Sequence, residues 1–163
     1  MALIDMKHAG VALKRTAGDV EALYRSERER LFRSLVAYCG RMSVAEDAVA
    51  EAFAQLLRNT SNIEHPKAWV WHAAFRIAAG ELHRAPAALD VAPPSLEVDP
   101  DTLALIEALS QLSVLQRGSV VLHHYAGYPT EEVATMLEST PTAVRVHLHR
   151  GRARLREILE AEQ

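Results

Sequence analysis

Positively charged side chains recur on one face of the segment 140–156, close to the C-terminal end of the sequence. This segment holds five arginines and no acidic residue. At helical spacing, Arg145, His149, Arg152 and Arg156 fall on a single stripe. A guanidinium group can bond a phosphate, or the edge of a guanine, through two parallel hydrogen bonds. The residue types and their spacing therefore predict contact with nucleic acid.

Two helices joined by a short turn would position this stripe. Thr130 is expected to cap a short helix, with Glu131 and Glu132 at its positive end, and Thr140 is expected to cap the long helix. The long helix has a second, apolar stripe made of Val144, Leu148, Gly151, Leu155 and Ile158. Two helices of this kind, the second with an apolar face toward the protein and a basic face toward solvent, are typical of a helix-turn-helix that enters a DNA major groove. A solvated basic helix, or a helix that holds a partner protein, is the alternative.

Capping residues and apolar periodicity divide the N-terminal half into three helices. Asp19 is expected to cap the first helix, which Gly40 ends in a left-handed conformation. Ser43 and Glu46 have the spacing of a capping box that opens the second helix. The third helix is expected over residues 66–84, where a proline fits the first turn.

A stretch without periodicity separates these helices from the rest of the chain. Residues 85–100 contain four prolines and no glycine, which predicts an extended linker. Asp99 and Pro100 are expected to restart helical structure as cap and first-turn residue. Ser113 and Gln116 have the spacing of a second capping box.

The predicted fold is therefore all-α. A three-helix N-terminal domain and a four-helix C-terminal helix-turn-helix domain are joined by the extended linker. The expected divisions are a tail at 1–18, a first domain at 19–84, a linker at 85–99 and a second domain at 100–163. Two domains on one linker could hold two sites at once, because the second binding event is then intramolecular.

Composition and spacing argue against several kinds of chemistry. The net charge is −3, and the single cysteine, Cys39, allows neither an internal disulfide nor a cysteine-rich zinc site. The eight histidines are scattered, and no glycine-rich loop could cradle a phosphate. We therefore expect that the protein is not an enzyme, with no catalytic residues, no metal and no cofactor.

The sequence also predicts a cytoplasmic protein. Asp5, Lys7 and His8 interrupt the N-terminal segment, which therefore lacks the apolar centre of a signal peptide. No apolar run approaches the roughly 20 residues that cross a bilayer. Membrane insertion is not expected.

Four segments, in this order, resemble those of one protein family. They are AEDAVAEAF (45–53), AWVWHAAFRIAAGELHR (68–84), LSQLSVLQRGSVVLHHYAGYPTEEVA (109–134) and TAVRVHLHRGRARL (142–155). Together they resemble the bacterial sigma factors of the extracytoplasmic-function (ECF) type, the smallest class of the sigma-70 family. The resemblance implies a sigma factor that binds core RNA polymerase, directs promoter recognition and transcription initiation, and has an anti-sigma factor as a further partner.

The resemblance also assigns candidate residues to three surfaces. The −35 promoter element would be read or clamped by Thr142, Arg145, Val146, His149 and Arg150. The −10 element would be served by Asn59, Ser61, Asn62, Trp71, Arg76, His83 and Arg84. Core polymerase would bind the face around Glu46, Asp47 and Glu51. A role for Trp71 and Arg76 with single-stranded bases requires that both side chains are exposed.

The sequence departs from the family pattern at several positions. Glutamine is usual in place of Ala50, proline in place of Ser113, and the turn glycine in place of Glu138. Asn and Asp are usual in place of Arg76 and Gly80. The departures at Ala50, Arg76 and Gly80 support one alternative function, a sigma-like decoy that sequesters an anti-sigma factor without directing initiation. A polymerase-independent helix-turn-helix repressor would leave the first domain unexplained.

Overall fold

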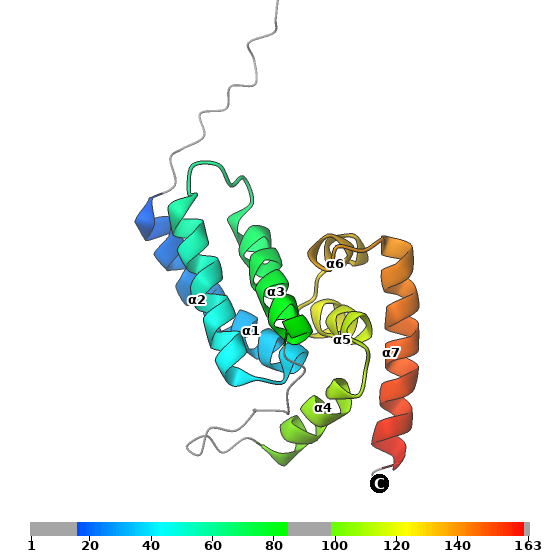
Figure 1. Cartoon of the computed structure of the whole chain (residues 1–163). Coiled ribbons are helices and arrows are strands. Elements are labelled where there is room, and N and C mark those ends of the chain that lie inside the picture. The colour runs from blue at the N-terminus through cyan, green and yellow to red at the C-terminus, as the bar shows by residue number, and fades with distance from the viewer. Residues whose placement is uncertain (1–15, 85–98, 162–163) are drawn as a thin grey trace, which may run out of the picture.

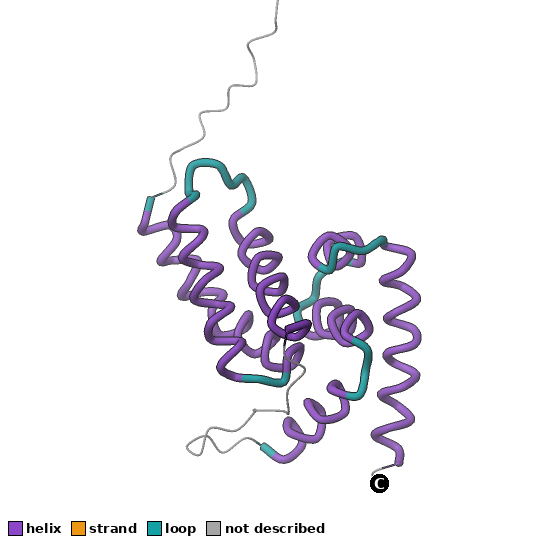
Figure 2. Tube along the Cα trace, viewed as in Figure 1, coloured by secondary structure: helices purple, strands orange, loops and turns teal. Residues whose placement is uncertain are grey.

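The computed structural model describes residues 16–84 and 99–161, which fold into helices and short connections (Figures 1 and 2). Within these ranges there are seven α-helices, one short π-helix and no strand, so the predicted all-α fold is confirmed. The helices are α1 (Ala17–Cys39), α2 (Met42–Arg58), α3 (Pro66–Arg84), α4 (Pro100–Ser110), α5 (Val114–Val120), η1 (Val121–Tyr125), α6 (Thr130–Met136) and α7 (Pro141–Ala161). Here η1 is the π-helix, which continues α5 without a break.

The first three helices pack against one another, and α4 to α7 gather on one side of them (Figure 1). Their common core is built around large side chains of α1 and α3. Leu31, Leu35 and Tyr38 of α1 are buried beside Trp71 and Phe75 of α3. The Tyr38 and Phe75 rings lie 4.9 Å apart, and the Trp71 and Phe75 rings stack at 6.2 Å.

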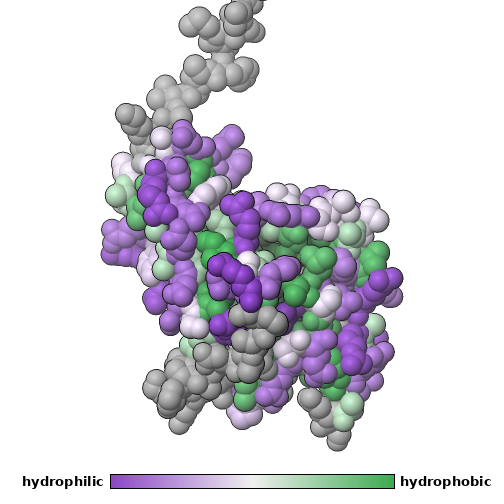
Figure 3. Space-filling view, viewed as in Figure 1, coloured by the Kyte–Doolittle hydropathy of each residue, from purple (hydrophilic) through white to green (hydrophobic). Residues whose placement is uncertain are grey.

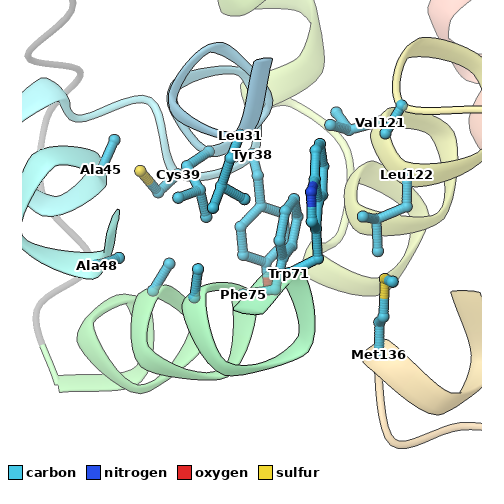
Figure 4. Packing of buried hydrophobic residues seen from close by; sticks show 14 of the residues in the cluster. Leu31, Tyr38, Cys39, Ala45, Ala48, Trp71, Phe75, Val121, Leu122 and Met136 are labelled. Atoms are coloured by element: carbon cyan, nitrogen blue, oxygen red, sulfur yellow. The ribbon is translucent and has the colours of Figure 1, made fainter. Parts of the chain in front are cut away.

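The C-terminal helices share this core. Val121 and Leu122 of η1 and Met136 of α6 belong to the same buried cluster as Trp71 (Figure 4). Helix α1 contacts α4, α5 and η1, and α3 contacts α6. The linker residues 85–98 and most of the tail lie outside the described residues, so the division into two domains remains a prediction.

Several helix ends follow the predicted capping chemistry. Gly40 ends α1 with a φ of 66°, in the left-handed region that glycine tolerates. Asp99 caps α4 through a hydrogen bond from the Thr102 backbone N–H, with Pro100 in the first turn. Ser113 and Gln116 form the predicted capping box, since each side chain bonds the backbone N–H of the other residue.

Three predicted caps were wrong. Thr16, and not Asp19, caps α1, and Asp19 supplies the third-position carboxylate of a capping box with Thr16. Helix α2 begins at Met42 without a side-chain cap, which places Ser43 inside its first turn. Helix α6 has Pro129 before it, and Thr130 is already the first helical residue. In each case helical geometry begins one to three residues earlier than the polar side chain suggested.

Candidate nucleic-acid interface

Helix α7 has two opposite faces. Val144, Leu148, Gly151 and Ile158 are buried on one side of it. The five residues assigned to the −35 element are all exposed, namely Thr142, Arg145, Val146, His149 and Arg150. At about 100° per residue, these five lie within an arc of about 140° on the side opposite the buried stripe. The exposed face is therefore available to a ligand while the other face holds α7 in the fold.

A glycine brings α7 close to α5. A Cβ atom at Gly151 would lie 3.0 Å from Cγ2 of Val120, so a larger side chain would force the two helices apart. The start of α7 is fixed as predicted, because the Thr140 hydroxyl accepts a hydrogen bond of 3.1 Å from the Ala143 backbone N–H. Close packing and capping together set the direction in which the exposed face points.

The turn between α6 and α7 contains a left-handed residue. Glu138 has a φ of 52° and is the only non-glycine residue with positive φ in the described ranges. The Ser139 backbone N–H closes the turn by donating to the Ala134 carbonyl at 2.8 Å. Glycine adopts this conformation easily, whereas other residues pay about 1–2 kcal/mol. The sequence analysis placed Glu138 at the position where a turn glycine is usual. The backbone at Glu138 has the left-handed conformation that a glycine adopts easily.

An ion pair joins the two helices of this motif. The Glu131 carboxylate on α6 lies 3.4 Å from the Arg145 guanidinium on α7, and both side chains are largely exposed. Further along α7, Arg154 pairs with Glu157 at 3.1 Å. Sequence reasoning assigned Glu131 only to the helix dipole and missed its contact with Arg145. No local signal could have revealed it, since the contact depends on how α6 and α7 cross.

The −10 candidates fall into separate groups. Asn59, Ser61 and Asn62 are exposed in the connection between α2 and α3. The Asn59 side-chain amide donates to the Gln55 carbonyl at 3.0 Å, which ties it to the end of α2. His83 lies at the far end of α3, about 25 Å away by the rise of a helix of that length. The structure therefore does not bring all the −10 candidates together.

Two candidates at the end of α3 contact their own helix. His83 Nδ1 lies 2.7 Å from the Ala79 carbonyl oxygen. Arg84 pairs with Glu81 at 2.6 Å and also donates to the Gly80 carbonyl at 3.3 Å. Arg76, nearer the middle of α3, is exposed, as its predicted role requires.

Trp71 is not available to bases in this conformation. Its side chain is fully buried, and its indole N–H donates to the Glu27 carboxylate at 3.1 Å. The Tyr128 ring lies 5.2 Å away, in an edge arrangement. The predicted role of Trp71 with single-stranded bases required an exposed side chain. This requirement is not met, because the C-terminal helices cover the face of α3 that carries Trp71.

The proposed polymerase face lies on α2. Glu46, Asp47 and Glu51 are all exposed there. Glu51 accepts hydrogen bonds from Gln55 and Arg58, and these lower the pKa of its carboxyl group. Glu46 and Ala50 border a groove of about 390 Å³ between α1 and α2, whose other walls include Tyr24, Arg28, Phe32 and Met42.

A larger apolar groove was not foreseen from the sequence. It measures about 750 Å³, lies between α1, α4, η1 and α7, and is lined in part by Phe32, Leu109 and Leu155. Leu105 and Tyr125 also line it and remain 46% and 52% exposed. Elsewhere on the molecule, Figure 3 shows hydrophobic residues gathered where the two groups of helices meet, with hydrophilic residues around them.

Neither a group of three or more candidate metal ligands nor a membrane-spanning helix is found among the described residues. In residues 16–84 and 99–161, no three His, Cys, Asp or Glu side chains form a group that could hold a metal ion. No helix in the same residues has both the length and the apolar character needed to span a bilayer. The described part of the chain thus offers a helical scaffold on which α7 exposes Arg145, His149 and Arg150.

The fold and this face define a helix-turn-helix protein, and comparison with known proteins shows which proteins it resembles. Residues 102–155 match the family model "Sigma-70, region 4". The chain is 28% identical, over 158 residues, to "Probable ECF RNA polymerase sigma factor SigI" of Mycobacterium tuberculosis, covering 85% of this chain and 54% of that protein. It is 42% identical over 66 residues to "RNA polymerase sigma-E factor" of Streptomyces antibioticus, covering 40% of this chain and 37% of that protein.

A solved structure agrees in fold. The sigma factor RpoE from Bartonella quintana, in complex with the anti-sigma factor NepR, matches 88% of this chain and 99% of its own with a TM-score of 0.66 and 20% identity. In sequence the chain is thus similar to ECF sigma factors, and residues 102–155 match region 4 of the sigma-70 family. It spans about half the length of the SigI relative.

Proposed function

We propose that the chain acts as an alternative sigma factor, which binds core RNA polymerase and directs it to promoters for transcription initiation. The observation that carries the proposal is the exposed face of α7, with Arg145, His149 and Arg150, inside the segment that matches sigma-70 region 4. In this role the protein works in the bacterial cytoplasm, where promoter DNA and RNA polymerase are found.

The first half of α7 would enter the major groove at the −35 element. Recognition helices of this motif contact base edges mainly through their N-terminal residues, which here include Thr142, Arg145 and Val146. Arg145 would bond a guanine edge through two hydrogen bonds, and Val146, which is 41% exposed, would contact a thymine methyl group. Arg150, further along the helix, suits a phosphate.

The connection between α2 and α3 would serve the −10 element. Asn59, Ser61 and Asn62 are exposed there and carry hydroxyl or amide groups that could bond the edge of a flipped base. One hydrogen of the Asn59 amide nitrogen bonds the Gln55 carbonyl, which leaves the other hydrogen to donate and the side-chain oxygen to accept. Arg76 is exposed and would add a phosphate contact.

Two protein partners complete the proposal. Core polymerase would bind the acidic face of α2 around Glu46, Asp47 and Glu51, beside the groove that Ala50 borders. An anti-sigma factor is a further partner, by analogy with the complex of RpoE and NepR. No cofactor or metal is needed for these roles.

In-vitro transcription with core polymerase on fragmented genomic DNA tests the proposal. Addition of the protein should produce new start sites that share two spaced upstream motifs. Arg145→Ala should lower −35 affinity by about 1–3 kcal/mol, because one base-edge contact is lost. Arg154→Ala is the matched control: it removes the same charge from α7, at a residue that pairs with Glu157. An unchanged −35 preference in Arg145→Ala rules out the assignment of that residue.

The decoy function remains the second candidate. It is favoured by Ala50, which is exposed on the proposed polymerase face and offers no hydrogen-bonding side chain there. A decoy would bind an anti-sigma factor but would not bind core polymerase. Absence of both core binding and new start sites in the same experiment would therefore replace the first proposal with this one.

A further inference from the structure

Two consecutive histidines lie side by side on the short π-helix η1. The ring centres of His123 and His124 are 4.9 Å apart, and the two rings are inclined at 72°. Consecutive side chains of an α-helix point about 100° apart, so such a pair usually diverges. A π-helix has more residues per turn, which brings the two side chains closer together. The spacing of the eight histidines along the sequence therefore does not reveal this pair.

The end of η1 fixes the geometry around the two histidines. The Ala126 backbone N–H donates to the Val121 carbonyl at 2.9 Å, which closes a turn of the π-helix. Gly127 follows with a φ of 77°, in the left-handed region that glycine tolerates. The chain therefore turns back at Gly127, and this turn brings the Tyr128 carbonyl within hydrogen-bond distance of His123.

This hydrogen bond decides which nitrogen of His123 carries the hydrogen. The Nδ1 atom lies 2.9 Å from the Tyr128 carbonyl oxygen. A carbonyl oxygen can only accept, so Nδ1 donates, and Nε2 of the neutral ring keeps its lone pair. Histidines that bind metal ions usually donate their other ring N–H to a carbonyl or a carboxylate in this way. His123 thus has Nε2 available as a ligand, and the neighbouring His124 is exposed to solvent.

The distance between the two rings fits two ligands of a single ion. Zinc binds an imidazole nitrogen at about 2.0–2.1 Å, which places the ring centre about 3.2 Å from the ion. Two such rings at the tetrahedral angle of about 109° would have centres about 5.2 Å apart, and at the square-planar angle of about 90° they would be about 4.5 Å apart. The observed 4.9 Å lies between these two values.

We infer that His123 and His124 together bind one divalent metal ion of the nickel, copper or zinc type. Imidazole suits these ions, whereas magnesium and calcium prefer oxygen ligands. In residues 16–84 and 99–161 no third His, Cys, Asp or Glu completes a group with them, so water fills the remaining positions of the ion. The site goes beyond the proposed sigma function and does not depend on it.

A positive charge beside the pair limits the affinity of this site. Burial lowers the pKa of His124, and the charges of His123 and of Arg152 on α7 lower it further. The Arg152 guanidinium would repel a bound dication for the same electrostatic reason. Removal of the Arg152 charge should therefore strengthen metal binding. This effect is opposite to the loss of a ligand, so the two kinds of variant test the site independently.

Calorimetric titration of the full chain, untagged and freed of metal, with zinc chloride and nickel chloride measures the site. The protein is titrated at pH 7.5 without DNA or polymerase, and one ion should bind per chain. X-ray absorption at the zinc edge should then show two imidazole nitrogens at about 2.0–2.1 Å, with oxygen in the other positions. A chain that binds no ion, or binds it through oxygen alone, overturns the inference.

His124→Gln should weaken binding about tenfold or more, because one of the two protein ligands is lost. His124 is exposed, so its replacement should leave the fold intact. His123→Gln should weaken binding equally, and thermal unfolding without metal checks that this variant folds after losing its bond to Tyr128. His65→Gln is the matched control, since it removes an exposed histidine from the connection between α2 and α3. Equal Kd values for His124→Gln and His65→Gln would show that the two rings merely pack edge to face, and would overturn the site.

Arg152→Gln should lower the Kd for zinc about threefold to tenfold, because a repelling charge is removed. Arg154→Gln is its control: it removes the same charge from α7, at a residue that pairs with Glu157 and points about 160° away from Arg152 around the helix. Equal Kd values for these two variants would contradict an ion bound beside His124. Because none of these measurements uses DNA or polymerase, failure of the metal site leaves the proposed sigma function untouched, and failure of that function would appear only as absent transcription.

Discussion

The carboxylate of Glu131 lies 3.4 Å from the guanidinium of Arg145, so helix α6, before the turn, contacts an arginine of helix α7, after it. Both side chains are more than half exposed, and such pairs contribute little to stability. What the pair can do is orient the guanidinium. With one nitrogen facing Glu131, Arg145 is held in one direction across the face of α7, and less of its conformational freedom is lost when it meets a base edge.

Glu131→Gln should therefore change base discrimination as well as affinity. Loss of one negative charge should strengthen binding to any duplex, since less charge repels the phosphates. Only the loss of orientation should weaken the preference at the base that Arg145 is proposed to read. Glu132→Gln is the control, as it removes the same charge from the neighbouring exposed residue. Binding to −35 duplexes with each base varied in turn measures both effects, and identical specificity profiles for the two variants would refute the orienting role.

The contrast between Arg145 and Trp71 shows how much the sequence could predict. Helical periodicity separated the exposed and buried sides of α7 correctly, because a single helix fixes which residues share a face. The same reasoning could not decide the exposure of Trp71. Its environment depends on Tyr128, which is distant in the sequence and reaches Trp71 only through the packing of α3 beside α6.

The capping errors have a related cause. Ser43 was a reasonable N-cap from its spacing to Glu46, but the helix starts at Met42, beside the left-handed Gly40. Where a polar residue stands within one turn of a helix start, local chemistry permits more than one starting point. Glu138 was the opposite case. Its backbone conformation could be anticipated, because the turn between two closely packed helices allows few alternatives.

Gly80 and Gly118 should respond oppositely to alanine. A Cβ atom at Gly80 would meet only Arg84 Nη2, at 3.6 Å, so Gly80→Ala should stabilise the protein by about 0.5–1 kcal/mol through helix propensity. At Gly118 it would lie 2.9 Å from Leu137 and 3.1 Å from Tyr38, so alanine should destabilise the protein by about 1–3 kcal/mol. Urea unfolding of both variants checks this, and destabilisation by Gly80→Ala would mean that the glycine is needed for packing.

Glu138→Gly should stabilise the turn. The left-handed φ of 52° costs a residue with a Cβ about 1–2 kcal/mol, and part of the gain is offset by the greater freedom of glycine when unfolded. The expected net gain is about 0.5–1 kcal/mol in the free energy of unfolding. Glu138→Ala removes the carboxylate but keeps the Cβ, so it should give no such gain. Equal stability of the two variants would show that charge, and not backbone strain, matters here.

Acidification should destabilise the fold through His72. Burial lowers the pKa of His72 below its ordinary 6.5, the positive charge of Arg76 lowers it further, and the Glu138 carboxylate opposes them. As the pH decreases below about 6.5, His72 binds a proton more readily in the unfolded chain than in the folded chain. The free energy of unfolding therefore decreases as the pH decreases below this value. Above about pH 6.5, His72 has no effect on it. Urea unfolding at pH 7.5 and 5.5 should show a smaller loss for His72→Gln than for the natural sequence. The same loss in both would remove His72 as a cause.

Ala50→Gln should strengthen binding to core polymerase. The resemblance to ECF sigma factors implies a glutamine in the polymerase-docking segment at this place, and Ala50 is exposed beside the groove that Glu46 also borders. One added hydrogen bond is worth about 0.5–1.5 kcal/mol, or about a threefold to tenfold lower Kd. Ser43→Gln, on the same helix but outside that groove, is the control and should leave the Kd unchanged. Weaker binding by Ala50→Gln would contradict this prediction. It would mean that an apolar group of the polymerase occupies the groove, where alanine leaves room for it and glutamine does not. Ala50 would then be an adaptation of this chain to its polymerase.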